Sequence, residues 1–145
     1  MRFVTLIARI LLGLPFTVFG LNTVLMSVFD KAFMPPPKDM PQASAAFFQT
    51  MTNTRFMLPL LGGVQLVSGL MILTGVMTPL GLTLLAPVIV HIVLFHHFVD
   101  PNGVSLAYAL LAVELFLAFA YGPAFCGVLD PRARARWSRK QAGSS

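Results

Sequence analysis

Residues 57–99 read MLPLLGGVQLVSGLMILTGVMTPLGLTLLAPVIVHIVLFHHFV, a stretch that contains no Asp, Glu, Lys or Arg. A membrane-spanning helix needs about 20 mostly apolar residues. The stretch is therefore long enough for two spans, which we place at 57–77 and 79–99. The segment MTPL, residues 77–80, supplies the turn between them. A connection this short makes the two helices antiparallel neighbours.

Two further apolar runs flank this pair. Residues 3–29 are interrupted only by Arg9 and Asn22, and residues 104–122 follow the turn-forming segment DPNG at 100–103. Hydrophobic residues make up 57% of the chain and charged residues only 10%, against about 25% charged in soluble domains. We predict an all-α integral membrane protein, a four-helix up-down bundle formed by residues 1–130. We expect the first run to be kept as a signal anchor.

The loop at 30–56 is the only long connection between the spans. Its segment ASAAFFQTM, residues 43–51, favours a short helix with Phe47, Phe48 and Met51 on one side. We interpret it as an interfacial helix that lies on the membrane. The alternative is an ordered loop packed over the mouth of the bundle.

Basic residues predict the orientation of the chain. The tail at 131–145 is rich in arginine, Arg2 lies at the other end, and the turn at 100–103 has no basic residue. The positive-inside rule therefore places both termini in the cytoplasm. We expect the basic tail to set this topology and to contact lipid rather than nucleic acid.

The first three spans carry a recognisable pattern. The pattern lies in the segment ARILLGLPFTVFGLN at 8–22 and in the glycine-rich second span with its Thr-Pro turn. Its residues are Arg9, Gly13, Phe16, Gly20, Gly69, Gly75, Thr78 and Pro79. The chain resembles the DoxX-like family of small four-helix bacterial membrane proteins. The resemblance implies a multi-pass protein of the bacterial cytoplasmic (inner) membrane. It also implies an association with membrane oxidoreductases, since some members accompany them, including the small subunit of a thiosulfate:quinone oxidoreductase. Many relatives have a lysine where this chain has Asn22 and Thr23, and a glutamate where it has Gln65.

Polar residues inside the spans are the candidate site. Glu114 is the most costly of them, because a charge at the bilayer centre costs about 3 kcal/mol or more. We expect it to be buried and either paired with Arg9 in an ion pair or active in proton handling. At about 1.5 Å of rise per residue, four polar residues from four different spans fall in one layer of the outer half. They are Asn22, Gln65, His91 and Glu114.

The three histidines separate by depth. We expect His91 to be buried, with Glu114 or Gln65 as its partner, and His96 and His97 to lie near the interface. All three come from one span and no two share a face in the i, i+4 manner of a helical metal site. We therefore predict no metal site and no haem held by two histidines of this chain. The single cysteine, Cys126, excludes an intrachain disulfide and a cysteine metal cluster.

Two functions follow from this layer. The first is an accessory subunit of a membrane oxidoreductase with a pocket for a quinone-type head group, in which His91 and Gln65 donate hydrogen bonds and Glu114 is the proton partner. The alternative is a non-catalytic structural or assembly subunit of a larger membrane complex, with other membrane proteins or further copies of this chain as partners. A transporter is disfavoured because the chain has no internal repeat.

Overall fold

The computed structural model describes residues 2–35 and 40–125 of the chain. The basic tail at 131–145 and Cys126 lie outside the described residues. The described part is α-helical, with one 3-10 turn and no strand. The elements are α1 (Arg2–Phe29), α2 (Gln42–Asn53), α3 (Met57–Thr74), α4 (Thr78–Phe98), η1 (Pro101–Gly103), α5 (Val104–Ala120) and α6 (Gly122–Phe125).

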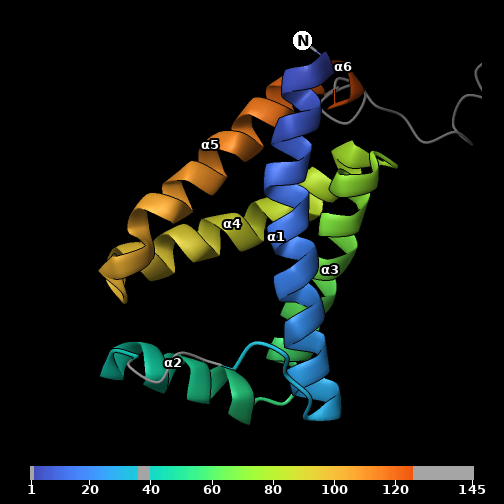
Figure 1. The fold of residues 1–145 in the computed structure, drawn as a ribbon. Coiled ribbons are helices and arrows are strands. Elements are labelled where there is room, and N and C mark those ends of the chain that lie inside the picture. Colours follow the sequence, from blue (N-terminus) through green and yellow to red (C-terminus); the bar gives the residue numbers. More distant parts are fainter. Residues whose placement is uncertain (1, 36–39, 126–145) are drawn as a thin grey trace, which may run out of the picture.

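Four of the described segments are long and apolar enough to cross a membrane: Phe3–Phe29, Met57–Thr74, Thr78–Phe98 and Pro101–Ala120. Successive spans run in opposite directions, with the N-terminus and α6 at one end of the molecule and α2 at the other (Figure 1). The predicted all-α membrane bundle is confirmed.

Helix α3 ends three residues earlier than the sequence indicates, at Thr74 rather than 77. Gly75 adopts the left-handed conformation with φ 83°, and its N–H donates to the carbonyl of Met71. A glycine in this conformation commonly ends a helix, because it has no Cβ to clash with the backbone. Met77, with φ 53°, then starts α4 at Thr78. The turn between the two spans is therefore tight.

Helices α1 and α3 form the closest packed pair of the bundle. A Cβ atom on Gly13 would lie 2.8 Å from the backbone nitrogen of Leu73, and one on Gly69 would lie 2.6 Å from that of Thr17. The glycines therefore allow the two backbones to touch, which is how helices associate where lipid gives no hydrophobic driving force.

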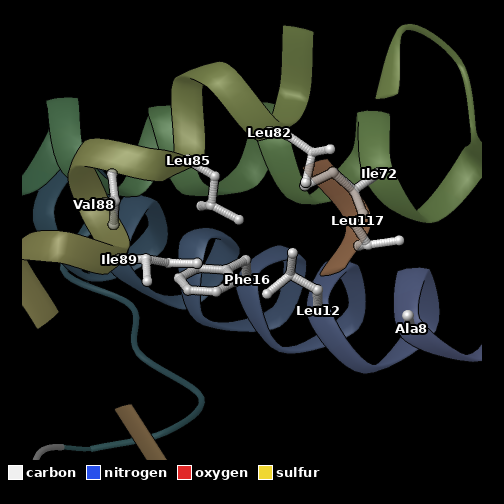
Figure 2. Packing of buried hydrophobic residues seen from close by; sticks show 9 residues of the cluster. All are labelled: Ala8, Leu12, Phe16, Ile72, Leu82, Leu85, Val88, Ile89 and Leu117. Atoms are coloured by element: carbon white, nitrogen blue, oxygen red, sulfur yellow. The ribbon is translucent and has the colours of Figure 1, made fainter. Parts of the chain in front are cut away.

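The apolar core lies where the four spans face one another. Figure 2 shows Phe16 of α1 beside Leu12 and Ile89, with residues of α3, α4 and α5 around them. Its buried members are Ala8, Leu12, Phe16, Ile72, Leu82, Leu85, Val88, Ile89 and Leu117. Helix α5 contributes only Leu117 to this set. It is the least buried span: 17% of its most apolar stretch is buried inside the protein, against 33% for α3 and for α4.

The short helix in the first loop is α2, and it lies across the end of the bundle (Figure 1). Ser44 and Met51 are buried, and Phe47 packs its ring against α4, while Phe48 is 41% exposed. The face of α2 that carries Ser44, Phe47 and Met51 thus packs on the protein. The helix predicted in the first loop is thus present as Gln42–Asn53, and its position on the membrane surface stays a prediction.

Candidate functional site

Glu114 is buried within α5, as predicted. Its side chain is 5% exposed, on the same side of the helix as the fully buried Leu117. Its Oε2 atom has no hydrogen-bond partner among residues 2–35 and 40–125. A buried carboxyl oxygen without a partner costs free energy of folding. The described fold therefore leaves one carboxyl oxygen of Glu114 without a hydrogen bond.

Arg9 does not pair with Glu114 in the part of the chain that the structure describes. Its Nε donates to the carbonyl of Ile72 at 2.8 Å, and its Nη2 donates to the carbonyl of Leu73 at 3.0 Å. These are among the last carbonyls of α3, which have no partner within the helix. Arg9 thus caps α3, and Gly75 leaves room for its guanidinium, because a Cβ there would collide with it.

Asn22 is buried because it holds the start of the first loop. Its Oδ1 accepts from the backbone N–H groups of Phe33 and Met34 at 3.0 and 2.9 Å, and its Nδ2 donates to the carbonyl of Met34 at 3.0 Å. Three backbone hydrogen bonds take up most of what one amide can make. This role accounts for Asn22 without a ligand.

Gln65 lies inside the α1–α3 pair and is 8% exposed. A Cβ on Gly20 would lie 2.9 Å from its carbonyl carbon, so the backbone of Gln65 packs directly against α1. No hydrogen bond joins its side chain to another described residue, and none joins any two of the four predicted layer residues. Gln65 and Glu114 are thus two buried polar groups on different helices with unused hydrogen-bonding capacity.

His91 is exposed, and the expectation that it is buried is wrong. The buried side of α4 carries Leu82, Leu85 and Ile89. His91 is two residues beyond Ile89, about 200° around the helix, so it points away from the core. The expectation rested on the depth of His91 along the helix, and depth does not determine the direction of a side chain.

The ring of His91 instead lies under α2. Its centroid is 5.6 Å from that of Phe47, which in turn is 5.1 Å from Phe95. These three rings, with Leu94 and Val99, line a pocket of about 180 Å³. His91 has no hydrogen-bond partner among the described residues. The sequence showed the apolar face of α2 but not the contact of Phe47 with His91, since the two residues are 44 positions apart.

The other two histidines lie at the end of α4. One ring nitrogen of His96, Nδ1, is 3.0 Å from the carbonyl oxygen of Asp100, and Nδ1 of His97 is 3.4 Å from the hydroxyl of Tyr108. His96 thus contacts the turn between α4 and α5, and His97 contacts α5 itself. In the described residues no group of three His, Cys, Asp or Glu side chains could hold a metal ion.

The sequence of α1 to α4 matches a known family. A family model described as DoxX matches residues 4–98. The chain belongs to the DoxX family. The match ends at the last residue of α4, so Arg9, Gly75 and His91 lie within the DoxX region, whereas α5 and Glu114 lie beyond it. No curated protein and no solved structure is significantly similar to the chain.

Proposed function

We propose that this DoxX-family protein is an accessory subunit of a membrane oxidoreductase and that it holds a quinone-type head group in the pocket between α2 and α4. The observation that carries the proposal is the position of His91 beside Phe47 and Phe95 in a pocket of about 180 Å³. Small-molecule sites in proteins are typically apolar and aromatic with a few polar groups that fix orientation. This pocket has that composition.

The chemistry of the pocket suits a flat ring with carbonyl groups. Aromatic side chains such as Phe47 and Phe95 pack favourably against a planar ring in stacked or edge-on arrangements. His91 can donate a hydrogen bond from one ring nitrogen while the other accepts. The family's association with membrane oxidoreductases supports a quinone as the ring compound, because quinones are the mobile electron carriers of such enzymes.

The buried polar groups have a secondary place in the proposal. Gln65 and Glu114 have unused hydrogen-bonding capacity, but neither lines the pocket beside His91, so we assign neither of them a contact with the bound ring. Asn22 is engaged by the backbone of Phe33 and Met34. We therefore place the head group at His91 and not in a layer shared by all four residues.

A titration of the purified protein with a short-chain ubiquinone analogue tests the proposal. His91→Leu should weaken binding by up to about tenfold, because one hydrogen bond to a ring carbonyl contributes up to about 1.5 kcal/mol and leucine cannot form it. His97→Leu is the matched control on the same helix and should bind like the unmodified protein. Equal affinity of the unmodified protein and His91→Leu would overturn the proposed site.

One observation favours the second candidate function, a structural or assembly subunit. The least buried span, α5, exposes a run of large apolar side chains: Leu106, Tyr108, Leu115, Phe116 and Phe119. In a bilayer this surface contacts lipid, and in a larger complex a helix of a partner or of a second copy packs on it in place of lipid. Release of the protein from the membrane as part of a larger complex, without measurable quinone binding, would favour this function over the first.

A further inference from the structure

A second pocket lies at the opposite end of the molecule from α2, between the first turns of α1 and the end of α5. Its volume is about 760 Å³. Arg9 is part of its lining, and so are Val4, Leu6, Phe116 and Phe119. The pocket is thus largely apolar with a guanidinium at one side. It is separate from the proposed quinone site and does not depend on it.

The charge of Arg9 is only partly compensated within the described residues. Its two hydrogen bonds go to the carbonyls of Ile72 and Leu73, and no described carboxylate forms an ion pair with it. The end of a helix carries about half of a negative charge. The helix end therefore offsets only part of the charge of Arg9, and a guanidinium has five N–H donors, of which these bonds use two.

The depth of Arg9 places this charge near the lipid phosphates. Its hydrogen bonds join it to the end of α3, where the chain turns through Gly75 and Met77 into α4. Non-helical backbone is not tolerated facing the hydrocarbon core. The turn, and with it the guanidinium, therefore lies close to the level of the head groups on the side of the N-terminus.

The walls of the pocket suit an acyl chain. Val4, Leu6, Phe116 and Phe119 are 55%, 44%, 43% and 84% exposed, respectively. In a bilayer, such exposed apolar side chains face lipid. A basic group between transmembrane helices at the membrane surface is a known way of binding anionic lipid head groups.

We propose that this pocket is a specific site for an anionic glycerophospholipid, whose phosphate binds Arg9 and whose acyl chain lies along Phe116 and Phe119. A free phosphate ion would use the same guanidinium but not the apolar walls. The lipid completes the charge balance of Arg9 and fills the space between α1 and α5. It therefore links the span outside the DoxX match to the family core.

Native mass spectrometry of the purified full-length protein, titrated with dioleoylphosphatidylglycerol in detergent, tests the site. We expect one lipid to bind more tightly than the others and more tightly than dioleoylphosphatidylcholine. Arg9→Gln should weaken that binding by about tenfold or more, since hydrogen bonds to charged groups contribute about 1.5–3 kcal/mol. The matched control is Arg55→Gln, an exposed arginine between α2 and α3, which should bind like the unmodified protein.

A second variant guards against loss of fold in Arg9→Gln. Ala120 lines the pocket and is exposed, so Ala120→Trp should fill the site, keep the helical circular dichroism spectrum and weaken phosphatidylglycerol binding while Arg9 is intact. Three results would overturn the proposal: undiminished binding in both pocket variants, equal weakening by Arg55→Gln, or competition by glycerol 3-phosphate or inorganic phosphate as strong as that of the lipid.

Discussion

Arg9 in the first helix donates a hydrogen bond from Nε to the carbonyl of Ile72, 63 residues away, at 2.8 Å. This contact ties the N-terminal part of α1 to the end of α3. Gly75, just beyond that end, takes φ 83° and leaves space for the guanidinium. Two residues of the family pattern that are far apart in the sequence, Arg9 and Gly75, therefore form one structural unit.

The unit predicts coupled effects on stability. Arg9→Met leaves the carbonyls of Ile72 and Leu73 without their partner and should lower the free energy of unfolding by about 2–4 kcal/mol. Gly75→Ala places a Cβ against Arg9 in a left-handed conformation and should cost about 1–3 kcal/mol. Unfolding in sodium dodecyl sulfate followed by circular dichroism measures both. The double variant should lose less than the sum of the two, and strict additivity would argue against the contact.

The α1–α3 contact predicts a contrast between two glycines of one helix. Gly69→Ala should destabilise by about 1–3 kcal/mol, because its Cβ would meet the backbone of Thr17, which has no room to move. Gly63→Ala is the control, since nothing lies within 4 Å of a Cβ at that position. It should be neutral or stabilise by up to about 1 kcal/mol. The same unfolding assay distinguishes the two, and a similar loss in both would refute the close packing described for α1 and α3.

Replacement of Glu114 should have an effect on stability that is unusual for a buried residue. Glu114→Leu removes a carboxyl whose Oε2 has no described partner and should leave stability unchanged or raise it by about 1–3 kcal/mol. Glu114→Gln, which keeps the shape and removes the charge, is the comparison. Thermal unfolding in detergent gives the answer. A clear loss of stability in Glu114→Leu would mean that the carboxyl has a partner in the folded protein.

The hydrogen bonds of Asn22 predict that its replacement affects the first loop locally. Asn22→Leu should free the backbone N–H groups of Phe33 and Met34, which the Asn22 side chain now binds. Hydrogen exchange followed by mass spectrometry should show faster exchange in peptides covering 30–35 and unchanged exchange in α3. Asn53→Leu, at the end of α2, serves as the control. Unchanged exchange at 30–35 in Asn22→Leu would rule out this role.

The orientation of the chain is a prediction from its basic residues. With Arg2 at one end and the arginine-rich tail at 131–145 at the other, both termini should be cytoplasmic. Fusions of alkaline phosphatase and of green fluorescent protein to the C-terminus report the side directly. Active phosphatase at the C-terminus would place the tail outside and disprove the predicted topology.

The sequence by itself determined the class of the fold and the number of spans. Charge-free runs such as 57–99 have a single stable arrangement in a bilayer, because their backbone groups must bond within the helix. The glycines of α1 and α3 are at the helical spacing that serves close packing, but the structure was needed to show that these two helices meet. The burial of Glu114 followed from the same reasoning, because a carboxyl exposed to lipid is too costly.

Only the tertiary structure decided what each polar residue contacts. Asn22, Gln65, His91 and Glu114 have similar predicted depths, but depth determines only the position of a residue along its helix. The partner depends on the rotation of each helix and on the path of the loops. The rotation of α4 turns His91 away from the core and toward Phe47, the path of the first loop occupies Asn22, and the end of α3 takes Arg9. These contacts join residues that are 11 to 64 positions apart, and helical periodicity carries no information over such separations.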